Sequence, residues 1–274
     1  MLVPAPPLVL VFAGSDPTAG AGLQADLLTL GSLGCHGLTV VTALTVQDTA
    51  GVERVMPLGP DWVMDQARRL LADMAVSAIK IGLLGSVENA AAVAEVVAEH
   101  PDVPLVLDPV LASGRGDRLA DEGTPAALRE LLVPQSTVVT PNSVEVRRLA
   151  LAADEHDAPL AACAERLLSD GAAYVLVTGT HERTPQVVNT LYAADCVVRE
   201  DRWERLPGAY HGSGCTLASA IAALLANGLD VPQAVREAQE YTWQTLRAAF
   251  RPGMGQLVPD RFFWARAAGE DDAA

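Results

Sequence analysis

One glycine-rich stretch ahead of a helix-forming segment decides how the chain is interpreted. It reads Gly208-Ala209-Tyr210-His211-Gly212-Ser213-Gly214-Cys215-Thr216. The alanine- and leucine-rich residues 217–226 predict a helix, and Asn227-Gly228 provides its C-terminal stop. A glycine-rich turn that opens a helix leaves several backbone N–H groups unpaired at the positive end of the helix dipole. The stretch therefore predicts an anion site made of backbone.

Cys215 falls in the first turn of this predicted helix. The helix dipole favours a thiolate there, so we expect the pKa of the thiol to be lowered. The stretch would then hold a phosphoryl group and also supply a proton acceptor for the group that attacks it. The alternative interpretation is a buried helix entered through a flexible turn, with Cys215 as a small core residue.

Composition limits the class of protein. Half of the 274 residues are apolar, which suits one sizeable α/β domain, here expected over 1–266 with a disordered acidic tail at 267–274. A net charge of −15 argues against nucleic-acid and anionic-membrane partners, because both require basic surface. No apolar run reaches the ~20 residues of a membrane span, and the N-terminus lacks the basic region of a signal peptide. The four cysteines lack zinc-site spacing, so we expect a cytoplasmic protein.

Strand-like and helix-like segments alternate along the chain, which predicts a doubly wound, mostly parallel sheet flanked by helices. The expected parallel strands are 8–13, 38–46, 77–82, 105–107, 138–140 and 174–177, and short antiparallel strands are expected near 189–206. The expected helices are 23–33, 60–73, 88–99, 125–132, 158–169 and 230–250.

Polar side chains follow several of these strands, at the edge where open α/β sheets bind ligands. Gln47 and Asp108 each come directly after a strand. The amide of Gln47 offers a donor and an acceptor side by side, which complements an aminopyrimidine edge, although a solvated loop glutamine has the same sequence signal. Asn142 and Glu145 stand three residues apart at the start of a helix, a spacing typical of an N-capping pair and compatible with metal binding through water.

The strand-end loops carry Gly14, Gln47, Asp108, Asn142, Glu145 and Thr178, with the turn at 212–215 beside them. Phosphoryl transfer requires in-line positioning, a divalent cation and donors for the migrating charge, rather than covalent chemistry by the protein. These residues supply each requirement without a P-loop motif. The sequence therefore favours a phosphotransferase.

The sequence resembles the hydroxymethylpyrimidine and phosphomethylpyrimidine kinases of thiamine biosynthesis, in the ribokinase-like superfamily, from about Leu8 to about Phe250. Each matching stretch is weakly specific alone, whereas their order and spacing together are strongly specific. The stretches are Ala13-Gly14-Ser15-Asp16-Pro17, Gly20-Ala21-Gly22-Leu23-Gln24-Ala25-Asp26, Val40-Val41-Thr42-Ala43-Leu44-Thr45-Val46-Gln47, Lys80-Ile81-Gly82-Leu83-Leu84, Asp108-Pro109-Val110, Thr140-Pro141-Asn142 to Glu145, and Gly212-Ser213-Gly214-Cys215-Thr216.

The resemblance implies ATP- and Mg²⁺-dependent phosphorylation of the hydroxymethyl group of 4-amino-5-hydroxymethyl-2-methylpyrimidine, followed by phosphorylation of the monophosphate, in a homodimer. It implies that Cys215 takes the proton of the hydroxymethyl group while the backbone N–H groups of 212–215 bind the γ-phosphoryl group. The other implied site residues are Gly14, Asp26, Gln47, Leu83 and Val110 around the pyrimidine, Asp108 and Glu145 at magnesium, Gly212, Ser213 and Gly214 in the turn, and Asn142 and Thr178 at the nucleotide.

The chain departs from the family pattern in two places. The family often has Lys-Gly-Gly-His after the strand that ends at Val177, whereas this chain reads Thr178-Gly179-Thr180-His181 and lacks the phosphate-facing lysine. Residues 182–205 follow the pattern poorly, so the adenine site is unassigned. Three alternatives remain open: a pyridoxal kinase, a non-catalytic pyrimidine-binding protein, and a cysteine hydrolase that pairs Cys215 with His211.

Overall fold

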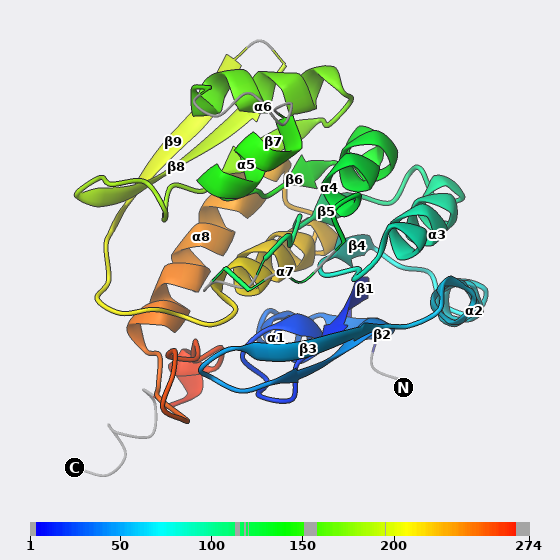
Figure 1. The fold of residues 1–274 in the computed structure, drawn as a ribbon, viewed down its shortest axis with the longest axis horizontal. Helices are drawn as coiled ribbons and strands as arrows, with labels where there is room; N and C mark the ends of the chain where they lie inside the picture. The colour runs from blue at the N-terminus through cyan, green and yellow to red at the C-terminus, as the bar shows by residue number, and fades with distance from the viewer. Residues whose placement is uncertain are drawn as a thin grey trace.

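The computed structural model describes residues 4–112, 116, 117, 119, 121–150, 158–194 and 196–266. A nine-stranded sheet runs through them in the order β3-β2-β1-β4-β5-β6-β7-β8-β9 (Figure 1). The strands are β1 (Leu8–Ser15), β2 (His36–Gln47), β3 (Val52–Pro57), β4 (Ala78–Ile81), β5 (Leu105–Leu107), β6 (Val138–Val139), β7 (Tyr174–Val177), β8 (Gln186–Ala193) and β9 (Cys196–Glu204). The predicted tail at 267–274 lies outside the described residues.

The six central strands are parallel, and the remaining three add antiparallel strands at the two edges. β2, β1, β4, β5, β6 and β7 pair in parallel, so their carboxyl ends share one edge of the sheet. β8 and β9 form the antiparallel edge that the sequence predicts near 189–206. β3 pairs antiparallel with β2 and was not predicted, because none of its six side chains is buried and its sequence shows no apolar alternation.

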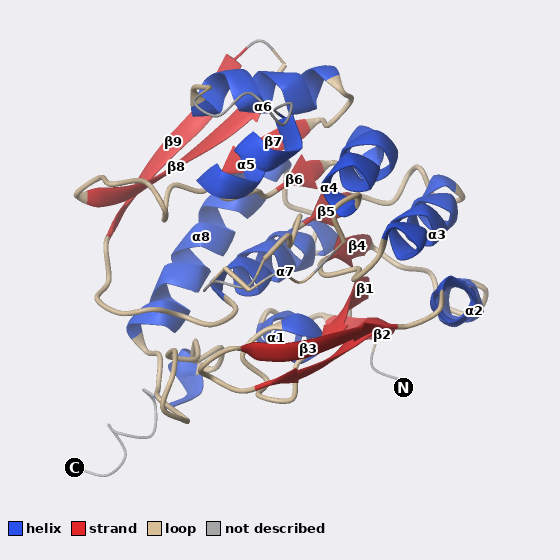
Figure 2. Ribbon diagram, in the orientation of Figure 1, coloured by secondary structure: helices blue, strands red, loops and turns tan. Residues whose placement is uncertain are grey.

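Helices cover both faces of the sheet (Figure 2), as a doubly wound fold requires. The helices are α1 (Gly22–Ser32), α2 (Pro60–Leu71), α3 (Val87–Ala98), α4 (Thr124–Ala127), α5 (Ser143–Ala150), α6 (Leu160–Ser169), α7 (Ser213–Ala226) and α8 (Val231–Arg247). The helix predicted at 125–132 is α4 followed by a π-helical turn at Leu128–Leu132.

The sheet separates two hydrophobic cores, one on each face, and the side chains of β1 point alternately into them. Val9 and Val11 point to the face covered by α1, α7 and α8, whereas Leu10 and Phe12 point to the face covered by α2, α3, α5 and α6. All four are fully buried. A strand covered on both sides must be apolar at every position, which is why 8–13 reads as an unbroken apolar run.

The segment after α8 returns to the N-terminal half of the molecule (Figure 1). The Gln256 N–H donates to the carbonyl of Thr49 at 2.8 Å, in the turn between β2 and β3. Residues far apart in sequence therefore meet at the edge where the parallel strands end. In the described part of the chain, no helix is long and apolar enough to cross a membrane.

Candidate functional site

A cavity of about 1080 Å³ opens where the parallel strands end. This volume is sufficient for two ligands side by side, since a single small-molecule site is typically ~300–1000 Å³. Gln47 and Cys215, which the sequence analysis assigned to one site, both line it although 168 positions separate them in the chain. The predicted site residues that line it are Gly14, Gln47, Leu83, Asp108, Val110, Asn142, Glu145, Thr178, Gly212, Ser213, Gly214 and Cys215.

The turn before α7 has the backbone geometry that an anion site needs. Gly212 is the N-cap with φ of 82°, in the left-handed region that favours glycine. A Cβ at this position would also overlap the carbonyl oxygen of Gly20. The first hydrogen bond of the helix runs from the Thr216 N–H to the Gly212 carbonyl at 3.0 Å, so the earlier N–H groups of the first turn have no helical acceptor.

The thiol of Cys215 is less acidic than the sequence predicts. Burial raises its pKa from an ordinary 9.0 to about 12. The Lys80 ammonium lowers the pKa, while the carboxylates of Asp108 and Asp26 raise it further. The expected lowering was wrong because desolvation outweighs the favourable field at the helix N-terminus. In the ligand-free protein the thiol is therefore protonated at neutral pH.

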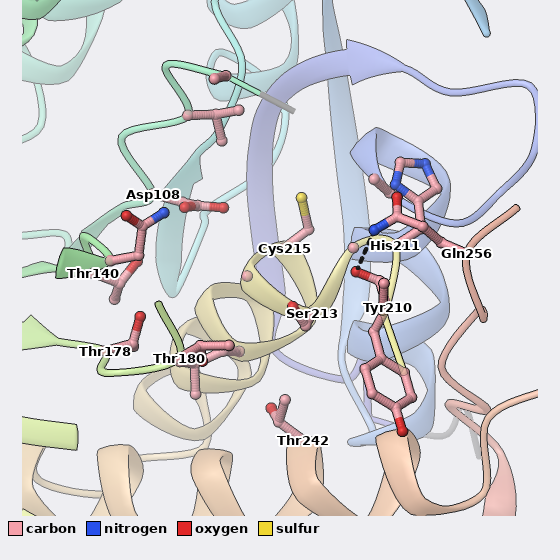
Figure 3. Close-up of a pocket in the computed structure, with 18 of the residues that line it drawn as sticks. Asp108, Thr140, Thr178, Thr180, Tyr210, His211, Ser213, Cys215, Thr242 and Gln256 are labelled. Carbon is pink, nitrogen blue, oxygen red and sulfur yellow. Dashed lines mark hydrogen bonds between the residues drawn. The ribbon is translucent and has the colours of Figure 1, made fainter. Parts of the chain in front are cut away.

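Asp108 and Cys215 face the same part of the cavity (Figure 3). Burial raises the pKa of Asp108 to about 6, and nearby Lys80 limits that rise. Asp108 Oδ2 is buried and has no hydrogen-bond partner among the described residues. A buried carboxylate oxygen without a partner is costly, so this atom is well suited to a bound cation.

Glu145 is the second carboxylate of the pair. Burial raises its pKa to about 8, and the repulsion of Asp108 adds to the rise. Its Oε2 accepts the Asn142 N–H at 2.9 Å, and Asn142 Oδ1 accepts the N–H groups of Val144 and Glu145 at 2.9 and 3.0 Å. This reciprocal capping box confirms the capping interpretation of the motif.

The two carboxylates fit Mg²⁺ better than a metal that requires a full set of protein ligands. The described residues contain no cluster of three or more His, Cys, Asp or Glu side chains arranged to hold a metal ion. Mg²⁺ prefers oxygen ligands and typically takes one or two carboxylates, completing its shell with water and substrate phosphates. The partnerless oxygen of Asp108, and the repulsion that Asp108 adds at Glu145, are the features that such a cation would relieve.

Asp26, predicted to surround the pyrimidine, does not line the cavity. It is fully buried, with Lys80 Nζ at 2.9 and 3.0 Å from its two carboxylate oxygens. Ser219 on α7 also donates to Asp26 Oδ1, at 2.7 Å. Asp26 is away from the cavity because it lies on the face of α1 that packs against the sheet and α7. Its effect on the cavity is electrostatic: it pairs with Lys80, which lines the cavity, and its charge raises the pKa values of Asp108 and Cys215.

His211 pairs with Asp16 and not with Cys215. Its Nε2 lies 2.8 Å from Asp16 Oδ2, and a Cβ on Gly20 would overlap the imidazole ring. The same carboxylate accepts the backbone N–H groups of Thr18 and Ala21 at 2.8 Å. The pairing required for a cysteine hydrolase is therefore absent between these two residues.

The sequence analysis missed the wall of the cavity formed by β9 and α8. Trp203 and Trp243 line it with their ring centroids 6.3 Å apart. Thr242 also lines it, with a buried hydroxyl that has no partner among the described residues. Figure 3 shows Thr242 on the same side of the α7 turn as Thr178 and Thr180. No sequence motif marks these residues, so the sequence analysis assigned no residue to this wall of the cavity.

The loop after β7, where the chain lacks the lysine often found in the family, is held by a series of hydrogen bonds. The Gly179 N–H donates to Asn189 Oδ1 at 3.0 Å, and Asn189 Nδ2 donates to Gln239 Oε1 at 2.9 Å. Gln239 Nε2 in turn donates to Asp201 Oδ2 at 2.8 Å. This buried chain of side chains joins the loop to β8, α8 and β9, and leaves the side chain of Thr178 on the cavity wall.

A family model and two curated relatives indicate the same family. A family model for phosphomethylpyrimidine kinase matches residues 16–260. The hydroxymethylpyrimidine/phosphomethylpyrimidine kinase of Streptomyces coelicolor is 40% identical over 264 residues, covering 95% of this chain and 96% of that protein. The corresponding protein of Mycobacterium bovis is 41% identical over 253 residues, covering 91% and 92%.

Solved structures extend the likeness to the fold. The pyridoxal kinase of Staphylococcus aureus in complex with AMP-PCP and pyridoxal has a TM-score of 0.85 at 28% identity, covering 96% of each chain. The phosphomethylpyrimidine kinase of Clostridium difficile has a TM-score of 0.75 at 30% identity, covering 88% of this chain and 99% of that one.

Proposed function

Because the chain belongs to the phosphomethylpyrimidine kinase family, we propose that it transfers the γ-phosphoryl group of ATP to the hydroxymethyl group of 4-amino-5-hydroxymethyl-2-methylpyrimidine and then phosphorylates the monophosphate, in thiamine biosynthesis. One observation carries the assignment to this cavity. Gln47, suited to an aminopyrimidine edge, shares the cavity with Cys215 and the N–H groups at the start of α7.

The pyrimidine occupies the side formed by β1, β2 and β4 in this proposal. Gln47 pairs with the aminopyrimidine edge through its amide donor and acceptor. Gly14, Leu83 and Val110 provide the close, apolar approach that a flat ring requires. An added Cβ at Gly14 would come within 3.1 Å of Leu83 Cδ2, so a larger residue there would displace the Leu83 side chain that lines this side of the cavity.

The transferred phosphoryl group lies against the first turn of α7. The N–H groups of Gly212, Ser213, Gly214 and Cys215 stabilise the negative charge that moves onto its oxygens. Asp108 and Glu145 would hold Mg²⁺, which neutralises phosphate charge when it is bound. Gly214 faces Asp108, since a Cβ there would lie 3.9 Å from both carboxylate oxygens.

The nucleotide extends from the α7 turn toward β9 and α8. Asn142 and Thr178 contact its phosphates, and the surface of Trp203, Thr242 and Trp243 accepts the adenosine. The buried hydroxyl of Thr242 supports this assignment, because a ligand donor or acceptor would satisfy it.

Cys215 accepts the proton of the substrate hydroxyl in this proposal. A thiol with a pKa of about 12 is protonated before substrates bind, so the thiolate must form in the loaded site. The Lys80 ammonium is the fixed charge that favours it. A loose transition state releases the hydroxyl proton late, when bond formation to phosphorus has made it acidic.

The experiment is to incubate the protein with ATP, Mg²⁺ and each pyrimidine and to measure the phosphorylated products and ADP. Cys215→Ala should lower kcat by about 10²–10⁴-fold and leave pyrimidine affinity largely intact. Cys196→Ala, at an exposed cysteine, is the matched control. Tight pyrimidine binding with no ADP release would instead establish a non-catalytic binding protein.

Pyridoxal kinase is the second candidate, favoured by the likeness to the Staphylococcus aureus structure across 96% of the chain. Pyridoxal is also a flat heterocycle bearing a hydroxymethyl group. The ratio of kcat/KM for the two alcohols decides between the candidates. A higher value for pyridoxal would overturn the pyrimidine assignment and leave the phosphotransferase assignment in place.

A further inference from the structure

Two segments that line the cavity from opposite ends of the sequence are packed directly together. One is the loop at 16–22 after β1, and the other is the turn that begins α7. A Cβ on Gly212 would overlap the Gly20 carbonyl and lie 3.0 Å from Ala21 Cα. The position of the loop at 16–22 relative to the turn proposed to bind the phosphoryl group therefore depends on this contact.

A buried arginine from a third segment joins the two. Arg261 is 2% exposed. Its Nη2 donates to the Gly20 carbonyl at 2.6 Å and its Nη1 to the Ala19 carbonyl at 3.3 Å. Its Nε donates to Thr216 Oγ1 at 3.1 Å on the first turn of α7. One guanidinium thus contacts both cavity-lining segments without lining the cavity itself.

The connection continues to the cap of the helix. Thr216 is fully buried, and its hydroxyl donates to the Gly212 carbonyl at 2.8 Å. Arg261, Thr216 and Gly212 therefore form a continuous hydrogen-bonded chain. The chain ends at the carbonyl of Gly212, the N-cap of α7, beside the N–H groups that are proposed to bind the phosphoryl group.

The loop that Arg261 contacts is held in an unusual conformation. Ala19 has a φ of 57°, in the left-handed region, which costs a non-glycine residue ~1–2 kcal/mol. Such a residue persists where its surroundings fix it. The Ala19 N–H donates to the Asp16 carbonyl at 3.1 Å, and its own carbonyl receives Arg261.

We infer that Arg261 is a positioning residue that fixes the loop at 16–22 against the first turn of α7, and so sets the distance between the bound alcohol and the phosphoryl group. The inference rests on the proposed function of the cavity. Arginine suits this role because its planar fork presents donors in fixed directions from three separate nitrogens, whereas a lysine ammonium presents its donors from one nitrogen on a flexible stem.

The test compares Arg261→Ala and Arg261→Lys with Arg266→Ala. Arg266 lies on the same segment, with a side chain 68% exposed, and should behave as wild type. In Arg261→Ala we expect kcat to fall by about 10²-fold, because a small misplacement of reacting groups has an effect of that size. Millimolar methylguanidinium should restore part of kcat by filling the vacated site, and methylammonium should not. Arg261→Lys should remain impaired.

Amide hydrogen exchange provides a readout independent of catalysis. The hydrogen-bonded amides of Thr18, Ala19, Ala21 and Thr216 should exchange faster in both Arg261 variants than in Arg266→Ala, with methylguanidinium slowing exchange again in Arg261→Ala. If Arg261→Ala does not fold, Thr216→Val removes the relay to the Gly212 carbonyl while keeping the side-chain shape, and the same loss of kcat is expected.

The inference fails if a folded Arg261 variant keeps kcat within twofold of wild type, or if kcat falls without rescue and without faster exchange in these two segments. A wild-type protein with no kinase activity would refute the proposed function instead. In that case the exchange measurements alone decide whether Arg261 holds the two segments together.

Discussion

Lys80 Nζ lies 2.9 Å from Asp26 Oδ1 and 3.0 Å from Asp26 Oδ2, and neither side chain has any exposed surface. Lys80 is the only lysine of the chain. The pair therefore holds the chain's single lysine ammonium beside the cavity, where its charge acts on Cys215 and Asp108.

Removing one partner of this buried pair should destabilise the protein strongly. Lys80→Met leaves the Asp26 carboxylate buried without its counter-charge, so we expect the free energy of unfolding to fall by about 3–5 kcal/mol in urea denaturation. Lys80→Met combined with Asp26→Leu should cost less than the sum of the two single changes. Arg54→Met, at an exposed pair with Glu53, is the control and should change stability by less than about 1 kcal/mol. A small effect of Lys80→Met would contradict the pairing.

The raised pKa of Cys215 predicts slow alkylation in the ligand-free protein. At neutral pH a shift from 9.0 to about 12 leaves about a thousandfold less thiolate. The rate with iodoacetamide should therefore be low at pH 7 and rise about tenfold per pH unit through pH 8–10. Peptide mass spectrometry measures it, with exposed Cys196 as the reference in the same sample. Alkylation of Cys215 faster than Cys196 at pH 7 would instead support the lowered thiol pKa that the sequence predicts.

Asp16 should contribute stability that is lost in acid. Burial alone would raise its pKa, but the hydrogen bond from His211 and those from the Ala21 and Thr18 backbone outweigh burial and lower it below 3.8. The folded state then binds this proton more weakly than the unfolded state, so the contribution is present above about pH 4 and disappears as pH falls through the lowered value. Asp16→Asn should cost about 1–3 kcal/mol at pH 7 and much less once the pH has fallen below the lowered pKa.

Denaturation of Asp16→Asn across pH measures this difference. Asp73→Asn, at an exposed aspartate, serves as the control and should give a curve parallel to that of wild type at every pH. A cost of Asp16→Asn that stays constant from pH 7 to pH 2 would show that the carboxylate charge does not matter.

Thr178→Lys should strengthen nucleotide binding. Thr178 lines the cavity at the end of β7, on a loop fastened through Gly179 to Asn189. A lysine there would add a cation beside the proposed phosphate site in a chain with a net charge of −15. We expect the Kd for a non-hydrolysable ATP analogue to fall about three- to tenfold in calorimetry, with a steeper dependence on salt. Thr178→Gln, similar in length but uncharged, is the control, and an equal gain with it would exclude the charge as the cause.

The sequence predicts the architecture well because the elements that carry it are buried on both faces. β5 at Leu105–Leu107 and β7 at Tyr174–Val177 are where the apolar runs indicate. Strand ends also locate the site, since the register of parallel strands brings Gln47, Asp108 and Thr178 to one edge. β3 escapes prediction because an exposed edge strand has no apolar pattern.

What the sequence does not predict depends on contacts between distant residues. The position of Asp26 on α1 gives no sign that Lys80, 54 residues later, faces it. The pKa of Cys215 depends on burial among carboxylates and not on the helix terminus alone. His211 looks like a partner for Cys215 at four residues' distance, yet its actual partner is 195 residues away at Asp16.

The contact between Arg261 and Gly20 spans 241 positions of the chain. During translation the loop at 16–22 is made among the first segments, and the arginine that holds it is added far later. N-terminal segments of a nascent chain begin to fold first, so the sheet can assemble while the loop still lacks its hydrogen bonds from Arg261. Catalytic competence should therefore appear later than the sheet as the chain is synthesised on the ribosome.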